Sequence, residues 1–285
     1  MSHLTVLRSY AQKRNPATLP ASLLFSHTDT SLTIFDGYPK SIFHFLVLPR
    51  PTNALNIFDL ADLPTLLRKD KTLAKETLLM LREEAGRVRT SIHEEMRKRY
   101  GFRWDVWIGF HAVPSMLHLH LHVISSDLCS PTLKHKKHYN SFHPKLGFFL
   151  HLEDVLGWFD AEPSYYKQKS QLKKSQYEPL LKEDLVCLHC ESPMKNMPTL
   201  KAHLQEEWET QRRRLARKRK TPDEVTPEPS TPSKKVASEL EAPDGNAVPS
   251  EPRNTVLIPA QPPSHRTTLY DYINMERSHH HLCTL

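Results

Sequence analysis

The feature that most constrains how this chain can fold is the run LHLHLH at positions 117–122, where apolar and polar residues alternate strictly. A β-strand sends successive side chains to opposite faces of its sheet. The run, with the apolar residues that follow it, therefore predicts a strand over 117–125. Its residues divide into an apolar row for the core, Leu119, Leu121 and Val123, and an opposite row of His118, His120 and His122.

Other periodic stretches describe the domain around this strand. Residues 31–36 and 42–48 are predicted strands joined by the turn residues of DGYPK, and FRWDVWIGF at 102–110 predicts another strand. Between them, apolar residues recur at spacings of three, four and seven, which predicts one long helix over 64–98. This order of elements predicts an α+β domain with an antiparallel sheet and flanking helices, which we place at residues 1–160.

Three interpretations compete for the histidine row. Exposed polar residues that happen to be histidines are a poor explanation for three in strict alternation with a fourth, His111, just upstream. A shared metal is also disfavoured, because positions i and i+4 of a strand lie ~13 Å apart, zinc–nitrogen bonds are only ~2 Å long, and the sequence shows no carboxylate beside the row. The third interpretation is nucleophilic catalysis, in which a neutral imidazole attacks phosphorus and its neighbours orient it and stabilise charge. We favour this interpretation, with one nucleophile and two supporting histidines.

A second motif lies at about residues 180–211. Cys187 and Cys190 form a C-x-x-C pair, and His203 follows on a predicted helix at zinc-finger spacing. The usual fourth histidine is missing, but Glu207 lies one helical turn after His203, and carboxylate is an acceptable zinc ligand. His189 is the rival fourth ligand, although its side chain should point away from a metal held by its neighbours. We therefore predict a small zinc finger of the two-cysteine, one-histidine type, whose structural zinc would supply most of the folding energy of so small a unit.

Composition divides the rest of the chain. We expect a linker over 161–179, a basic extension at 212–220 (RRRLARKRK) and a disordered tail over 221–285, which is rich in proline and acids and poor in large apolar residues. The net charge of +7 favours a polyanionic partner such as nucleic acid. The chain has only four cysteines, which indicates a reducing, intracellular compartment. It has no apolar run of membrane-spanning length, so we expect a soluble protein.

The motifs resemble a known superfamily. HLHLHVI is similar to the His-x-His-x-His-x-x signature of the histidine-triad nucleotidyl hydrolases and transferases, and GFHAVPSMLHLHLHVISSDLCSPTLKHKKHYNSF resembles the aprataxin branch in particular. DGYPKSIFHFLVLPR resembles the nucleotide-binding hairpin of the same family. The resemblance covers about residues 1–150 and again 180–210, where a Glu in the finger is similar to that of fungal-type relatives.

The resemblance implies roles for individual residues. The middle histidine, His120, matches the nucleophile that takes AMP, flanked by His118 and His122, and His111 matches the histidine that contacts the phosphate and assists the leaving group. The matching substrate-binding positions are Asp36 for the ribose, Lys40 for nucleic acid, Ser115 for phosphate and Lys134 for phosphate or DNA. Each has a simpler alternative: Asp36 could initiate a turn, Ser115 could bond the backbone, and the lysines could form a solvated loop. The residue that stacks on the DNA end is not identified by any match.

The function implied is that of a nuclear DNA-repair hydrolase. It would remove AMP from 5′-adenylated DNA ends left by abortive ligation, through a covalent histidyl-AMP and without a catalytic metal. The implied partners are DNA nicks or ends, RNA–DNA junctions, AMP as product, and a repair protein recruited by the tail, while we expect no forkhead-associated domain and no membrane. Two alternatives stay open: a hydrolase of small nucleoside phosphoramidates or dinucleotides, and a non-catalytic zinc-finger protein that binds damaged DNA.

Overall fold

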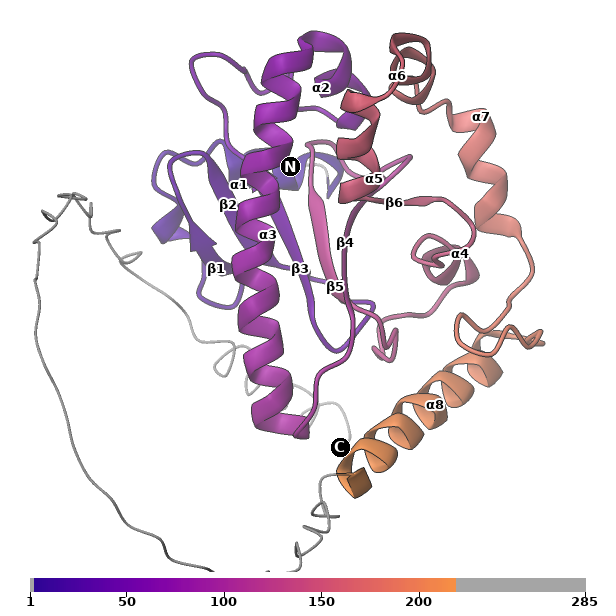
Figure 1. The fold of residues 1–285 in the computed structure, drawn as a ribbon. Helices are drawn as coiled ribbons and strands as arrows, with labels where there is room; N and C mark the ends of the chain where they lie inside the picture. Colours follow the sequence, from indigo (N-terminus) through magenta and orange to yellow (C-terminus); the bar gives the residue numbers. More distant parts are fainter. Residues whose placement is uncertain (1–2, 219–285) are drawn as a thin grey trace, which may run out of the picture.

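The computed structural model describes residues 3–218, apart from the side chains of His3 and Lys218. The end of the predicted basic extension and the whole predicted tail, 221–285, lie outside the described residues. One six-stranded sheet in the order β1-β2-β3-β5-β4-β6 forms the centre of the described part (Figure 1). Every neighbouring pair of strands is antiparallel, which confirms the predicted α+β class. The strands are β1 (Leu24–His27), β2 (Ser31–Phe35), β3 (His44–Pro49), β4 (Val106–His111), β5 (Leu121–Ser125) and β6 (Phe149–His151).

Helices cover the sheet and continue beyond its edge. They are α1 (Val6–Ala11), α2 (Leu63–Lys69), α3 (Lys71–Tyr100), α4 (Lys136–Asn140), α5 (Leu152–Gly157), α6 (Pro163–Lys169), α7 (Lys174–Tyr177) and α8 (Met197–Lys218). A 3-10 turn, η4 (Glu178–Lys182), follows α7. Within residues 3–218, no helix combines the length and apolar character needed to cross a membrane.

The sheet has a helix layer on each face. The long helix α3 lies across one face, where its buried Leu78 and Leu81 share a core with Val47 and Leu121 (Figure 1). On the other face, α1 packs Leu7 and its neighbours against β2 and β3. Since β2 and β3 are buried along their whole lengths, both of their faces are covered. The second face also holds the histidines described below.

The single helix predicted over 64–98 is wrong in one respect, because it is two helices. Asp70 separates α2 from α3 in an extended conformation, and its carboxylate accepts a hydrogen bond from the Leu73 amide at 2.8 Å. Asp62 caps α2 in the same way by accepting from the Thr65 amide. Aspartate is a strong N-cap residue. The apolar periodicity continues across the break, which is why spacing alone did not reveal it.

The prediction of one strand over 117–125 is also corrected. The strand begins only at Leu121, because His118 adopts a left-handed backbone conformation with φ of 96°. The amides of His118 and Leu119 donate to the carbonyls of Ala61 and Leu60, at 2.9 and 2.8 Å, and not to a neighbouring strand. The three histidines therefore do not form one row on one face of a strand. Similarly, the strand predicted at 102–110 is limited to β4.

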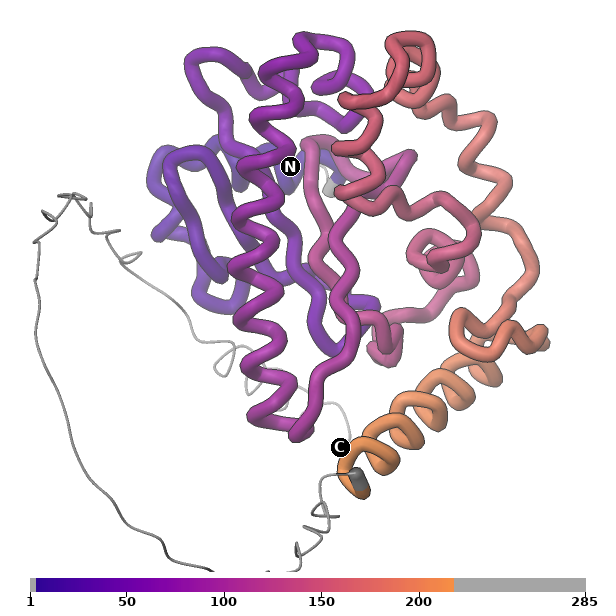
Figure 2. The backbone as a smooth tube through the Cα atoms, viewed as in Figure 1, coloured from indigo at the N-terminus to yellow at the C-terminus, as the bar shows by residue number. Residues whose placement is uncertain are grey.

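The segment expected to be a linker, 161–179, contains α6 and α7. Its Tyr166 hydroxyl donates to the Leu67 carbonyl at 2.8 Å, and Leu172 is buried in the core beneath α3. From there the chain descends along one side of the molecule to α8 (Figure 2). This segment therefore contacts the first domain at Tyr166 and Leu172.

Candidate active site and metal centre

Four histidines meet on the face of the sheet opposite α3. His111 ends β4, His122 lies in β5, His120 directly precedes β5, and His44 begins β3. The ring of His122 is central, with centroid separations of 4.4 Å to His111, 5.0 Å to His120 and 5.2 Å to His44. Sequence analysis did not identify His44, because a lone histidine in an otherwise apolar strand does not differ from an ordinary buried one. Its only sequence signal is its position in the hairpin that resembles the family.

The proton position on His120 follows from its hydrogen bond. Its Nδ1 lies 2.7 Å from the backbone carbonyl oxygen of His118. A carbonyl can only accept, so Nδ1 carries the hydrogen and donates. In the neutral ring, Nε2 therefore keeps its lone pair. This is the tautomer that a nucleophilic histidine requires.

A relay of hydrogen bonds also sets the tautomers of His44 and His122. The Lys40 amide donates to His44 Nδ1 at 3.2 Å, so the hydrogen of a neutral His44 is on Nε2. That Nε2 lies 3.0 Å from His122 Nδ1 and donates to it. The hydrogen of His122 is consequently on Nε2, a buried atom without a hydrogen-bond partner among residues 3–218. The buried Nε2 of His111 also lacks a partner in the described part of the chain, so the site holds unsatisfied ring nitrogens that can bond an anionic oxygen wherever they carry a hydrogen.

His118 supports His120 through its backbone. Its ring is fully buried, and its Nε2 donates to the Pro49 carbonyl at 2.7 Å. This anchors the left-handed backbone that turns the His118 carbonyl toward His120. A non-glycine residue held in such a conformation costs about 1–3 kcal/mol. The surrounding hydrogen bonds offset that cost, and the result is a fixed acceptor for the nucleophile candidate.

Burial keeps the clustered histidines neutral. It lowers the pKa of His44 and His118 to about 4, even though Asp36 raises the first and the bond to Pro49 raises the second. Burial likewise lowers the pKa of His120, against a smaller opposing effect of its bond to the His118 carbonyl. The pKa values of His111 and His122 fall well below the usual value, first through burial and then through their histidine neighbours. At pH 7 the unliganded cluster is thus uncharged.

Contrary to the sequence expectation, a carboxylate lies beside the cluster. Asp36, His44 and His122 offer ligand atoms within 4.8 Å of one another, a grouping that could in principle hold a metal. The hydrogen bond between His44 Nε2 and His122 Nδ1 occupies the lone pair that a metal would need. This donor set does not fit a metal as it is arranged.

The predicted substrate-binding residues are placed differently from one another. Asp36 accepts a hydrogen bond from the Tyr38 amide at 2.7 Å, as a turn residue would, and its other oxygen lies 3.6 Å from His44 Nε2. Lys40 is half-buried nearby, and burial lowers the pKa of its ammonium group while Asp36 raises it. Ser115 and Lys134 are exposed on the loops before β5 and α4. The structure thus places Asp36 and Lys40 at the histidine cluster and leaves Ser115 and Lys134 at the surface.

Asp127 is a second residue that sequence analysis missed. Its buried carboxylate accepts from the Trp104 indole at 3.0 Å, from the Ile42 amide at 2.9 Å, from the Cys129 amide at 3.0 Å, and from the Ser125 hydroxyl. Burial raises its pKa, and these hydrogen bonds oppose the shift. Asp127 therefore ties the turn of the hairpin formed by β2 and β3, called the β3 hairpin below, to the end of β5, which keeps His44 and His122 in register.

The residues of the predicted finger also converge. Cys187, Cys190 and His203 offer ligand atoms within 4.8 Å of one another, with 3.2 Å between Cys190 Sγ and His203 Nε2. Glu207 Oε1 lies 3.6 Å from the same His203 Nε2. Zinc bonds of about 2.0–2.3 Å separate tetrahedral ligands by about 3.5 Å, so the cluster of Cys187, Cys190 and His203 fits zinc. Hydrogen bonds with Ser192 lower the pKa of the Cys190 thiol to about 7, which favours the thiolate that binds metal.

The finger is attached to the sheet domain through α4. The Tyr139 hydroxyl donates to the Val186 carbonyl at 2.7 Å and accepts from the Leu188 amide at 2.9 Å, on either side of Cys187. The Asn140 amide group donates to the Glu183 carbonyl at 2.8 Å. These hydrogen bonds hold the knuckle, which is the turn from Cys187 to Cys190, against the second face of the sheet.

Two family models match the chain. One, described as "Scavenger mRNA decapping enzyme C-term binding", matches residues 5–138, and the other, "C2HE / C2H2 / C2HC zinc-binding finger", matches residues 145–210. The second match and the Cys/His cluster establish a zinc finger with a structural zinc. This match begins well before the knuckle, so it includes β6 and the helices that lead to it.

Curated relatives identify the family. An aprataxin-like protein of Saccharomyces cerevisiae is 30% identical over 225 residues, which cover 73% of this chain and 97% of the relative. The chain belongs to the aprataxin family. Other aprataxin relatives are longer: the aprataxin-like protein of Drosophila melanogaster is 37% identical over 65% of this chain and 24% of its own length. Aprataxin of Danio rerio is 35% identical over 62% of this chain and 47% of its own length. The chain thus spans between about a quarter and a half of these two relatives.

Solved aprataxin structures share the fold. An aprataxin ortholog from Schizosaccharomyces pombe has a TM-score of 0.54 at 27% identity, covering 74% of this chain and 96% of that one. An aprataxin ortholog in complex with DNA has a TM-score of 0.53 at 27% identity, covering 72% and 94%. Both comparisons cover a larger share of this chain than the sheet domain alone occupies. They confirm the predicted histidine-triad domain with an attached finger.

Proposed function

We propose that this aprataxin-family chain is a nucleotidyl hydrolase that removes AMP from 5′-adenylated DNA ends. The observation that carries the proposal is the tautomer of His120, whose Nδ1–H is bonded to the His118 carbonyl so that Nε2 is free to attack. Family membership and the DNA-bound ortholog support DNA as the polymer to which the AMP is attached.

The proposed reaction has two displacements at the AMP phosphorus. His120 Nε2 attacks first, so that a phosphorus–nitrogen bond forms while the bond to the 5′-phosphate oxygen of the DNA breaks, and the DNA end leaves with the electron pair. Water then attacks the same phosphorus and loses a proton to the solvent, the phosphorus–nitrogen bond breaks with its electron pair returning to His120 Nε2, and AMP is released. The two steps regenerate neutral His120 and leave a 5′-phosphate that a ligase can seal.

The other histidines stabilise charge and move protons. The Nε2–H of His122 is positioned as a donor for the phosphoryl oxygens, and His44 keeps that tautomer in place. His111 is neutral in the unliganded site, since burial lowers its pKa. A bound polyphosphate anion opposes that shift, so His111 takes up a proton as substrate binds and can donate it to the leaving oxygen. Asp36 then contacts the ribose, with Lys40, Ser115 and Lys134 on the phosphate or DNA side.

The finger and its basic helix are proposed to grip the nucleic acid. Thr210, Arg213, Arg214 and Arg217 line an exposed hollow on α8, where arginine side chains can contact the phosphate backbone. Glu207 is proposed as the fourth zinc ligand. A nuclear location, activity on RNA–DNA junctions and a repair partner of the tail belong to the same proposal.

The test is AMP release from a nicked duplex with a 5′-adenylate. The wild type should release AMP and, when quenched early, carry one covalently bound AMP. His120→Ala should lower the rate by a factor of about a thousand or more and carry none. His93→Ala on the far helix α3 is the control and should match the wild type.

Two results would reject this function. Hydrolysis of a small adenosine phosphoramidate without any action on adenylated DNA would favour a small-molecule hydrolase. Tight binding of the nick without turnover of either substrate would favour a non-catalytic zinc-finger protein.

A further inference from the structure

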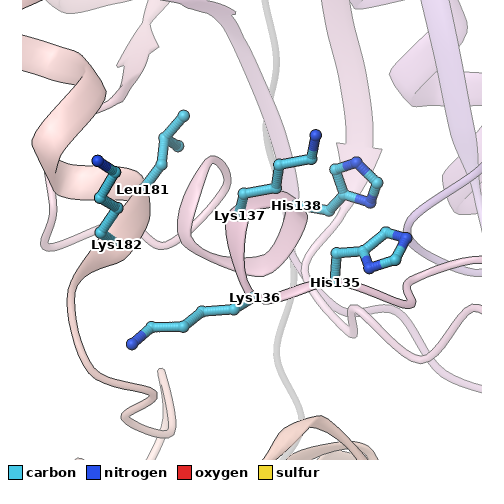
Figure 3. Close-up of a pocket in the computed structure, with 6 residues that line it drawn as sticks. All are labelled: His135, Lys136, Lys137, His138, Leu181 and Lys182. Carbon is cyan, nitrogen blue, oxygen red and sulfur yellow. The ribbon is translucent and has the colours of Figure 1, made fainter.

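A basic pocket lies between α4 and the turn η4, beside the histidine site. It has a volume of about 570 Å³, and Figure 3 shows its lining side chains coming from two separate segments of the chain. Three of the lining residues are lysines, two are histidines, and none is acidic. They are His135, Lys136, Lys137 and His138 from the α4 side and Leu181 and Lys182 from η4.

The pocket has more positive charge than its own surroundings neutralise. Lys136 forms an ion pair with Asp184 at 3.2 Å, but the Asp184 side chain is fully exposed. Among the described residues, Lys137 and Lys182 have no acidic side chain within 4.0 Å. Lysine side chains that line a hollow without an acidic lining residue favour an anion that comes from outside.

The walls of the pocket are held in place. The Asn140 amide group bridges α4 to the other wall by donating to the carbonyls of Leu181 at 3.3 Å and Glu183 at 2.8 Å. The next residue back, Tyr139, is fully buried and bonded to the zinc knuckle. Unlike lysines on a mobile loop, these lysines start from a backbone that is already ordered, so an anion would not have to order it.

The pocket is also next to the reacting groups. Phe142, four residues after His138, packs against His111 and His122 with ring centroids 4.6 and 5.2 Å apart. On the other side, Lys40 is close enough to His138 to lower its pKa, after the larger effect of burial. The α4 wall of the pocket therefore lies close to the histidine cluster, two residues before the Phe142 ring that packs on it.

We propose that this pocket binds one phosphodiester group of the adenylated strand, within the first three linkages from the reacting phosphate. The proposal rests on the proposed function, because it assigns the pocket to the same substrate. Lys137 and Lys182 are the positioning residues, one from each wall. The pocket would select polynucleotides over small adenylates, which have no phosphodiester to place in it.

The test neutralises both lysines with Lys137→Gln and Lys182→Gln. For adenylated DNA, kcat/KM should fall about tenfold or more, and the slope of its logarithm against the logarithm of salt concentration should fall by about 1. The maximal rate and hydrolysis of a small adenosine phosphoramidate should stay unchanged. The matched control, Lys167→Gln with Lys174→Gln on the nearby helices α6 and α7, removes the same charge from exposed lysines outside the pocket and should resemble the wild type.

A second measurement locates the phosphate. Substrates with a single neutral methylphosphonate at successive linkages should each be tested with wild type and variant. At one of the first three linkages, the neutral group should lower kcat/KM of the wild type by about the same factor as the two lysine substitutions do. At that linkage it should not lower kcat/KM of the double variant any further. Equal losses at every linkage, or a control variant as impaired as the pocket variant, would overturn the proposal.

The two proposals fail in different ways. If the wild type releases AMP from DNA and the pocket variant does so equally well at low substrate concentration, only the pocket assignment fails. If the wild type does not act on DNA, the function fails, and equilibrium binding of unadenylated 5′-phosphorylated DNA still tests the pocket. Unchanged affinity of the double variant in that assay would reject it.

Discussion

At the scale of single residues, hydrogen bonds to the backbone decide what each histidine can do. The His118 carbonyl fixes the hydrogen of His120 on Nδ1, and the Lys40 amide fixes that of His44 on Nε2. These partners are parts of the main chain, so they cannot change protonation when the pH changes. Neutrality of the rings has a different origin, which is their burial. Burial of these neutral rings therefore makes the folding stability of the protein depend on pH.

We expect the free energy of unfolding to fall between pH 7 and pH 5. The unfolded state has ordinary histidines with a pKa of ~6.5 and binds protons over this range, whereas His44 and His118, with pKa values of about 4, do not. The stability that these neutral histidines contribute is therefore fully present above their pKa in the unfolded state. It is lost as the pH falls toward their pKa in the folded state. The loss is about 2 kcal/mol for each such histidine, measured by urea unfolding at the two pH values.

A variant separates this effect from acid release of zinc. His44→Gln removes one buried titrating group but leaves the finger unchanged. The variant should be less stable than the wild type at pH 7, yet its loss between pH 7 and pH 5 should be about 2 kcal/mol smaller. Identical losses in the two proteins would show that His44 is not kept neutral by the fold.

At the scale of elements, the sequence predicted what local pattern determines. The strand predicted at 42–48 appears as His44–Pro49, because its nearly continuous apolar run reflects burial on both faces of the sheet. Cys187, Cys190 and His203 converge because their spacing is set within one knuckle and one helix. The bend at His118 was not predictable in this way, since it depends on carbonyls of Leu60 and Ala61, far away in the chain. Asp127 and His44 escaped prediction for the same reason: their partners are distant in sequence.

The finger provides a prediction at this scale. Glu207→Ala should release zinc to a chelator at least tenfold faster than the wild type, because it removes the oxygen next to His203 Nε2. Glu207→His should restore slow release, because histidine at the same helical position gives a two-cysteine, two-histidine site. The measurement is the rate of zinc transfer to a coloured chelator.

The neighbouring glutamate is the control. Glu206→Ala alters an exposed residue on another face of α8 and should not change the release rate. If Glu206→Ala and Glu207→Ala behaved alike, the fourth ligand would have to be sought elsewhere, with His189 as the first candidate.

At the scale of the whole molecule, the finger and the sheet domain share their hydrophobic cores. Leu200 and Leu204 of α8 are buried with Ile124 and Phe142, near the histidines. One turn later, Trp208 lies among the aromatic rings at the end of α3, with centroids 5.2 Å from Tyr100 and 5.6 Å from Trp104. The Trp104 indole in turn donates a hydrogen bond to Asp127, whose carboxylate also accepts from the Ile42 amide of the β3 hairpin. A continuous path of packed and bonded groups thus connects α8 to the hairpin that bears His44.

This shared core predicts that the sheet domain and the finger of the wild type unfold together in one transition. In Trp208→Ala we expect two separate transitions. Within the described part of the chain, the indole nitrogen of Trp208 has no hydrogen-bond partner, so the residue contributes through packing, and its truncation should cost about 3–5 kcal/mol. Trp208→Phe keeps an aromatic ring in the cluster and should cost clearly less. In one urea titration, circular dichroism reports the sheet and helices while a zinc dye reports the knuckle. The two transitions should coincide in the wild type and in Trp208→Phe, whereas in Trp208→Ala zinc should be released first. Coincident transitions at an unchanged midpoint in Trp208→Ala would mean that the bonds of Tyr139 and Asn140 suffice to join the finger to the sheet, and that the aromatic contact adds little.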